Sequence, residues 1–394
     1  MGIRSKPAPG LAIPPDVSQP DPKLQACYKI IAVLFAVVLG MGMAIFWLYP
    51  PAKKSEAPSL IFQLSSLEKN TIQAKYRDVD FTKFYPGVDA AIIDEIQRQC
   101  FATRFVYEPF VQFKPMAVNH QHVTISRNGY RLGSEEQPWP IESSNFNVFV
   151  FGGSTTFGYG LANSQTLVVE LQQAFRKRRG LPNIQCYNFG RGFYDSTQER
   201  LLFEILLQQG IVPDAVVFID GLNDFYFPDR DPILTAQLKQ FMAPDLPNLP
   251  KAQASGADEI IARMFANYRM VRSIAREFNI ETIFVLQPLP FYEYSPDAGN
   301  YPFTPDASGF SSITHGYERL HQLFLKLREE KPAVVANVNW LGSMFAEEKG
   351  PVYLDQVHYT HAAGKQLAEA ISSLFKNQPD QPGSEEQEAR AGDD

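Results

Sequence analysis

Cysteines and basic clusters are scarce in this sequence of 394 residues. The three cysteines are Cys27, Cys100 and Cys186. Cys100 and Cys186 could pair in an oxidising compartment or remain thiols, and the sequence leaves both outcomes open. The net charge is −7, and no basic cluster is interleaved with aromatic residues, which argues against a general affinity for nucleic acid. No repeat of fixed period is present.

The signature residues of three familiar loops are also missing around Ser154. The segment lacks the lysine of a phosphate-binding loop and the third glycine of a dinucleotide-binding fingerprint. Thr156 stands where the G-x-S-x-G elbow of α/β-hydrolases has its last glycine. A different serine nucleophile and a plain helix cap remain as interpretations of Ser154.

One long hydrophobic run is present. Ile30–Tyr49 carries no charge, and as a helix it would span about 30 Å, the thickness of a bilayer core. We expect a transmembrane helix; a cleaved signal peptide is the alternative, although Phe46–Pro50 is a poor cleavage site. The excess of lysine and arginine before the run favours a cytoplasmic N-terminus, so the main domain would lie outside the cytoplasm.

Composition and patterning divide the chain into six parts. We expect a disordered tail at 1–29, the transmembrane helix at 30–49, a linker at 50–79, an accessory region with a helix and short β elements at 80–146, a main domain at 147–377 and a disordered acidic tail at 378–394. Within the accessory region, Asn128-Gly129 is a turn signal between short strands. His120 and His122 would project from one strand face, but no carboxylate or cysteine accompanies them at ligand spacing, so no metal site is predicted.

The main domain alternates strands with helices, which predicts an α/β fold with a parallel sheet covered on both faces. The apolar residues of the intervening helices recur at i, i+3 and i+4. The predicted strands are Asn147–Phe151, Asn183–Asn188, Ala215–Asp220, Thr282–Gln287 and Ala333–Val338, and a last helix is predicted at Ala362–Lys376.

Polar residues follow three of these strands, where sites form in parallel sheets. The first strand runs into Gly152-Gly153-Ser154, the second into a loop with Gly190 and Gly192, and the third into Asn223. Backbone amides at Ser154 and Gly192, together with the Asn223 side chain, could bind the oxyanion that develops on an attacked carbonyl.

A base for Ser154 is available near the C-terminus. Asp355 precedes His358 by three residues, so both side chains can face one side of a turn. The carboxylate can then accept from one imidazole nitrogen and leave the other to take a proton from a serine hydroxyl. A nucleophile, a base and an orienting carboxylate are therefore all present in the sequence.

These blocks together resemble the SGNH hydrolases, the GDSL-type esterase and lipase superfamily, over roughly 147–377. The resemblance implies a flavodoxin-like, doubly wound five-stranded parallel sheet of order 2-1-3-4-5. It implies that Ser154, His358 and Asp355 form a catalytic triad and that Gly192 and Asn223 complete the oxyanion hole. Two departures stand out: Gly153 replaces the aspartate of the namesake pattern, and Gly190 rivals Gly192 as the family glycine.

We therefore expect a membrane-anchored serine esterase that hydrolyses an acyl or acetyl ester on an envelope glycan or lipid. Ser154 would form the acyl-enzyme and water would release it, with no cofactor and no metal. One alternative is an O-acyltransferase that passes the acyl group to a polysaccharide. Another is a non-catalytic glycan-binding module. The proline-rich segment Phe225–Gly256 is the candidate lid.

Overall fold

The computed structural model describes residues 78–133, 137–179, 183–227, 255–297, 299–303 and 307–375. The chain divides into two units, 1–59 and 60–394, and all described residues belong to the second. The predicted transmembrane helix, both predicted tails, nearly all of the linker and most of the candidate lid lie outside the described residues. Within these described ranges, no helix is long and apolar enough to cross a bilayer.

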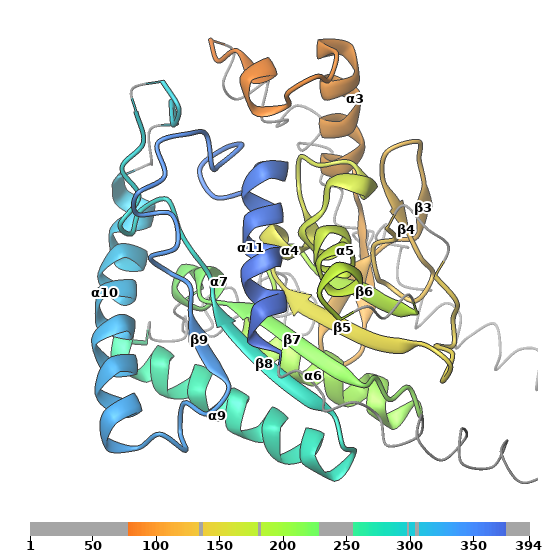
Figure 1. Ribbon diagram of the computed structural model, residues 1–394, viewed down its shortest axis with the longest axis vertical. Helices are drawn as coiled ribbons and strands as arrows, with labels where there is room; N and C mark the ends of the chain where they lie inside the picture. The colour runs from red at the N-terminus through yellow and green to blue at the C-terminus, as the bar shows by residue number, and fades with distance from the viewer. Residues whose placement is uncertain are drawn as a thin grey trace, which may run out of the picture. The chain divides into compact units, whose positions relative to one another are not determined.

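A five-stranded parallel sheet forms the centre of the fold (Figure 1). Its order, β6-β5-β7-β8-β9, is the predicted 2-1-3-4-5 order. The first four strands begin and end within two residues of the predicted bounds, because each is a short run of buried apolar residues. The strands are β5 Phe146–Gly152, β6 Ile184–Gly190, β7 Ala215–Asp220, β8 Glu281–Leu286 and β9 Val338–Trp340.

The predicted fifth strand, 333–338, is wrong in its position. Only Val338 belongs to both the predicted strand and β9. Asn337 has a φ of 59°, which breaks an extended strand. Arg272 donates hydrogen bonds to the carbonyls of Ala333 and Val334 at 3.0 and 3.1 Å, so these groups are satisfied by a side chain and not by a neighbouring strand.

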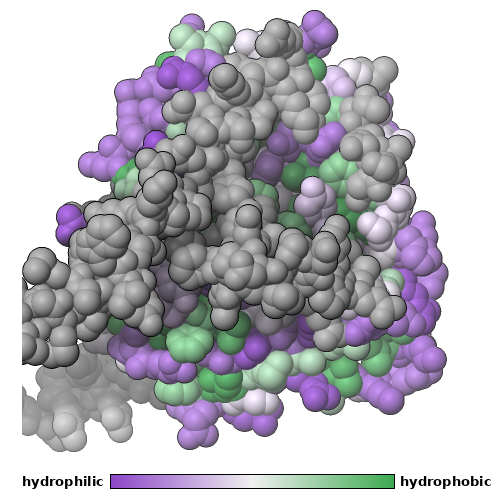
Figure 2. Space-filling model, turned by 180° about the vertical axis from the view of Figure 1, so that it is seen from behind, coloured by the Kyte–Doolittle hydropathy of each residue, from purple (hydrophilic) through white to green (hydrophobic). Residues whose placement is uncertain are grey.

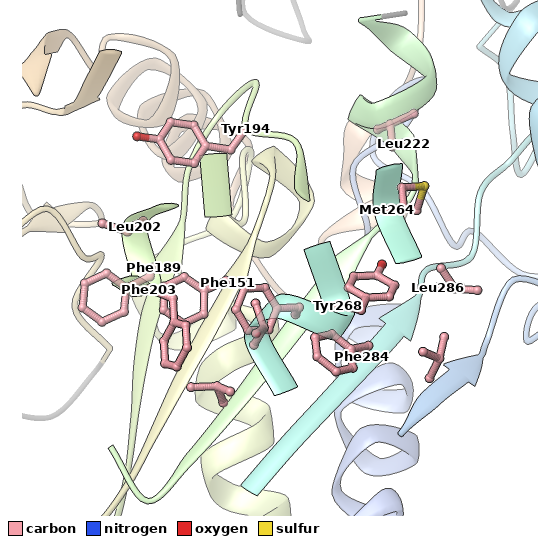
Figure 3. Packing of buried hydrophobic residues seen from close by; sticks show 14 of the residues in the cluster. Phe151, Phe189, Tyr194, Leu202, Phe203, Leu222, Met264, Tyr268, Phe284 and Leu286 are labelled. Atoms are coloured by element: carbon pink, nitrogen blue, oxygen red, sulfur yellow. The ribbon is translucent and has the colours of Figure 1, made fainter. Parts of the chain in front are cut away.

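Alternate residues of the central strands face opposite helical layers. On β5, Phe149 and Phe151 pack with α6, α9 and α10, whereas Val148 and Val150 pack with α5 and α11. Figure 1 shows α5 and α11 side by side on one face of the sheet, and Figure 3 shows Phe151, among other aromatic residues, in the cluster on the other face. The helices are α5 Leu167–Arg179, α6 Ser196–Gln208, α9 Ala257–Glu277, α10 Ala307–Glu330 and α11 His361–Leu374.

Phe149 and Phe151 are fully buried, and burying one such side chain stabilises the folded state by roughly 2 kcal/mol. A side chain caps the start of α6. Asp195 accepts from the amides of Thr197 and Gln198 at 3.0 Å at the start of α6. Where the outline in Figure 2 is coloured, hydrophilic residues make up most of its upper and right edges, as expected for a domain whose apolar residues pack inside.

The described residues of the accessory region pack beside β6, and an isolated antiparallel bridge between Arg131 and Asn188 joins them to it, but none of their strands belongs to the five-stranded sheet. The region's two small antiparallel sheets pair β1 with β2 and β3 with β4. The Asn128-Gly129 turn, with φ of 81° at Gly129, leads to Arg131, whose amide donates to the carbonyl of Asn188 on β6 at 2.9 Å. The elements are η1 Phe81–Phe84, α3 Ala90–Phe101, β1 Phe105–Glu108, β2 Gln112–Pro115, β3 Val118–Asn119 and β4 Thr124–Ile125.

Cys100 and Cys186 are free thiols, so the possible disulfide between them does not form. They are buried in two different hydrophobic clusters, and Cys100 Sγ instead donates to the carbonyl of Leu161 at 3.3 Å. His122 lies 3.7 Å from the carboxylate of Glu95. No group of three potential metal ligands occurs among the described residues.

Candidate active site

Ser154 begins the short helix α4, Ser154–Phe157, directly after β5. Gly152 and Gly153 make the turn between strand and helix: a Cβ on Gly152 would overlap the side chain of Thr156 two positions beyond Ser154. Ser154 is partly exposed, whereas the next three residues are buried. The turn therefore presents the serine side chain, and not its neighbours, at the carboxyl end of the sheet.

Arg131 holds the loop that follows α4. Its guanidinium is fully buried and donates to the carbonyls of Phe157 at 3.0 Å, Gly158 at 2.8 Å and Leu161 at 2.5 Å. It also donates to Asn163 Oδ1 at 3.2 Å. Burial lowers the pKa of Arg131. Arg131 was not predicted from the sequence, because an arginine after a turn carries no local sign that it will reach a loop 26 residues away.

Asp355 and His358, the predicted orienting carboxylate and base, are in direct contact. His358 Nδ1 lies 2.7 Å from Asp355 Oδ2, and Asp355 Oδ1 accepts from the amides of Val357 and His358 at 2.8 Å each. Burial alone would raise the pKa of Asp355, but His358 and the two amides outweigh it and hold that pKa below its ordinary value. The ionised carboxylate can only accept, so Nδ1 carries the proton and Nε2 is free to act as a base.

His358 Nε2 is buried and has no hydrogen-bond partner among the described residues, Ser154 included. The imidazole lies against the ring of Tyr159, with 5.6 Å between the ring centroids. The Tyr159 amide in turn donates to the carbonyl of Ser154 at 3.3 Å. The imidazole from the C-terminal part of the domain thus packs on the loop that begins at Ser154.

Asn223 lies beside the turn that carries Ser154. It belongs to α7, Leu222–Tyr226, after β7, and its Nδ2 donates to the carbonyl of Tyr194 at 2.6 Å. A Cβ on Gly153 would come within 2.5 Å of Asn223 Nδ2. A side chain at position 153 would therefore require Asn223 to move.

Hydrogen bonding distinguishes Gly190 from Gly192, the two candidates for the oxyanion-hole glycine. The amide of Gly190 donates to Asn188 Oδ1 at 2.9 Å, so it is already occupied. The amides of Gly192 and Phe193 donate to no residue in the described part of the chain. Phe193 has a φ of 70°, a conformation in which glycine is the usual residue, and sequence reasoning gave no indication of it. Between the two glycines, Gly192 has the amide that remains available.

A small cavity lies next to Gly153 and Asn223. Its volume is about 10 Å³, room for roughly one water molecule. Gly153 and Asn223 line it together with Thr155, Asp220 and Gln287. Thr155 Oγ1 donates to Gln287 Oε1 at 3.0 Å, which ties the start of α4 to the residue that follows β8.

Three buried carboxyl groups, those of Glu199, Asp220 and Asp224, also line this cavity. Burial raises the pKa of Asp220 to about 7, and burial together with neighbouring carboxyl groups raises the pKa values of Glu199 and Asp224 well above their ordinary range. Ser196 Oγ donates to Asp224 Oδ1 at 2.6 Å. Asp224 therefore has a structural contact, and the group as a whole brings together residues of α6, β7 and α7.

No family model matches this sequence, and no curated protein matches it either. Solved structures do align with it. An acetyl xylan esterase, AlAXEase, is 17% identical with a TM-score of 0.36, covering 58% of this chain and 100% of that one. A putative arylesterase from Agrobacterium tumefaciens str. C58 is 17% identical with a TM-score of 0.37, covering 58% and 96%. A putative lipolytic protein of the G-D-S-L family from Desulfitobacterium hafniense DCB-2 is 15% identical with a TM-score of 0.36, covering 59% and 100%.

Proposed function

We propose that this protein is a serine esterase in which Ser154 is the nucleophile, His358 the general base and Asp355 the group that orients the base. The observation that carries the proposal is the hydrogen bonding of the two ring nitrogens of His358. One ring nitrogen is fixed by an ionised carboxylate, and the other is buried, without a hydrogen-bond partner in the described part of the chain, and next to the loop that starts at Ser154. Catalytic hydrogen bonds are often long before substrate binds, so the missing Ser154 contact is compatible with this role.

The reaction proceeds in two steps. Ser154 Oγ attacks the ester carbonyl carbon while His358 Nε2 takes the hydroxyl proton. The intermediate collapses, the bond to the alcohol breaks, and Nε2 returns the proton to the leaving alcohol. Water then attacks the acyl-enzyme, giving its proton to Nε2, and the carboxylic acid is released as Ser154 recovers its proton.

The oxyanion formed in each step needs hydrogen-bond donors. We assign this role to the amides of Ser154 and Gly192 and to Asn223 Nδ2. Asn223 Nδ2 has two hydrogens, of which one binds the Tyr194 carbonyl and the other is available for the oxyanion. A preorganised donor of this kind contributes on the order of 3 kcal/mol to the stabilisation of the transition state.

The substrate that we propose is an acyl or acetyl ester on an envelope glycan or lipid. The predicted transmembrane helix at 30–49 supports it, because an anchor of this kind would hold the domain near such substrates on the extracytoplasmic side. Protease accessibility of the domain in intact spheroplasts tests this location: protection of the domain would contradict it.

The chemistry itself is tested with a fluorophosphonate probe, which reacts with activated serines. We expect an adduct on Ser154 by mass spectrometry, and no adduct in a folded Ser154→Ala variant. The same variant should lose hydrolysis of an aryl acetate. Labelling at another serine, or unchanged turnover in Ser154→Ala, would contradict the proposal. Formation of acylated product when a polysaccharide acceptor is added would identify acyl transfer in place of hydrolysis.

A further inference from the structure

Arg191 and Tyr194 connect the loop after β6 to the accessory hairpin β1–β2. Both are almost completely buried. Arg191 Nη1 donates to the carboxylate of Glu108 and, at 3.3 Å, to the carbonyl of Phe113. The Tyr194 hydroxyl accepts from Arg191 Nη1 at 2.7 Å and donates to the same Phe113 carbonyl. In Figure 3 this hydroxyl points away from the labelled core residues.

The backbones of the same two residues hold the proposed oxyanion donors. The Arg191 amide donates to the carbonyl of Gly152 at 2.9 Å, which fixes the loop to the turn before Ser154. The Tyr194 carbonyl accepts from Asn223 Nδ2 at 2.6 Å. Side chains that contact the hairpin and backbone groups that contact the site therefore belong to the same two residues.

Between them lie Gly192, with its available amide, and Phe193. The positive φ of Phe193 is unfavourable for a residue with a side chain, and such conformations persist when the surrounding structure fixes them. Here Arg191 and Tyr194, on either side of Gly192 and Phe193, fix the conformation through their hydrogen bonds. Among the described strands, β1 and β2 pair with each other alone, so the hairpin is not part of the central sheet and contacts the loop through side chains and carbonyls.

We infer that the β1–β2 hairpin positions the oxyanion donors through Arg191 and Tyr194, and that these two are positioning residues for the reaction. This inference rests on the proposed function. Loss of the hairpin contact lets the loop move, so that the Gly192 amide and Asn223 Nδ2 are less well placed when the oxyanion forms. Substrate binding before the reaction depends less on these donors, so the effect falls on kcat and not on KM.

The test compares two variants of the full-length protein, each of which loses the hydroxyl of one tyrosine. Tyr194→Phe keeps the ring and removes the hydroxyl that contacts the hairpin. The matched control is Tyr130→Phe, which removes another buried hydroxyl of the accessory region, one that donates to the carbonyl of Gln137 at 3.3 Å. We expect Tyr194→Phe to lower kcat for an aryl acetate about 10-fold at unchanged KM, less than the 10²-fold or more expected when an oxyanion donor is removed. Tyr130→Phe should leave kcat within about twofold of wild type.

Amide hydrogen exchange of residues 190–195 supplies a second measurement that does not depend on catalysis. Exchange in this segment should increase in Tyr194→Phe and remain as in wild type in Tyr130→Phe. Wild-type labelling at Ser154 together with an unchanged kcat in Tyr194→Phe overturns the positioning role and leaves the proposed esterase intact. Equal losses of kcat in the two variants also overturn it. Absence of Ser154 labelling in wild type overturns the proposed function, and the inference with it.

Discussion

Replacement of Asp220 by asparagine is expected to make the stability of this protein less sensitive to pH. Burial raises the pKa of Asp220 from 3.8 to about 7. Between these pH values, Asp220 has lost its proton in the unfolded chain and keeps it in the folded protein. Raising the pH therefore lowers the free energy of unfolding. The contribution of Asp220 to wild-type stability should therefore fall as the pH rises from 3.8 to about 7, and this group should cause no further loss above that range.

The size of the effect follows from this pKa difference. At about 1.4 kcal/mol per pH unit, the interval from 3.8 to about 7 corresponds to roughly 4 kcal/mol. Asp220 is only 4% exposed, so solvent does little to screen the effect. Glu199 and Asp224 have pKa values raised in the same direction, but both remain in the variant. Asp220 helps to raise both of these pKa values, so its removal lowers them as well, and this change also makes the stability of the variant less sensitive to pH.

The assay is urea unfolding of the full-length protein and of Asp220→Asn at pH 5 and pH 8. The stability difference should move in favour of the variant by roughly 3 kcal/mol between these two conditions. Asp258→Asn is the matched control, because the pKa of Asp258, an exposed carboxylate paired with Arg319, is lowered and its removal cannot produce this trend. A difference between wild type and Asp220→Asn that is the same at both pH values would refute the reasoning.

Other substitutions test the site and its support. Asp355→Asn should lower kcat on the order of 10⁴-fold, as loss of an orienting aspartate does in known triads, and steady-state kinetics with an aryl acetate would show it. Asn223→Ala should lower kcat by about 10²-fold or more with KM nearly unchanged; a large rise in KM alone would argue against an oxyanion role. Gly153→Ala should also reduce kcat, because its Cβ would displace Asn223 Nδ2, and a fully active variant would contradict the close approach. Glu108→Gln should destabilise the fold by about 3 kcal/mol in urea unfolding, since it leaves the buried Arg191 without its carboxylate; an unchanged midpoint would count against the ion pair.

Local pattern was enough to predict most of the main domain. Strands such as β5 and β7 are short, continuous apolar runs between turn residues, and a parallel sheet with helices on both faces produces that pattern wherever it occurs. The fifth strand was misplaced because 333–338 has the same apolar character. The side chain of Arg272 and the backbone of Asn337, neither of which periodicity reports, turn this segment into a loop.

The Asp355–His358 pair was also accessible from the sequence, because a separation of three residues already limits how the two side chains can meet. The choice between Gly190 and Gly192 was different. It depends on which amide is occupied, and the Asn188 side chain occupies that of Gly190 only once β6 and its loop have folded.

By itself, the sequence determined the order of strands and helices, the apolar faces and the local acid–base pair, since each depends on residues within a few positions of one another. Tertiary structure alone decided the packing of His358 on the loop that starts at Ser154, the contact between the hairpin and Arg191, and the raised pKa of Asp220. The physical reason is that burial, charge pairing and side-chain contact join groups tens to hundreds of residues apart, and they exist only after the chain has brought those groups together.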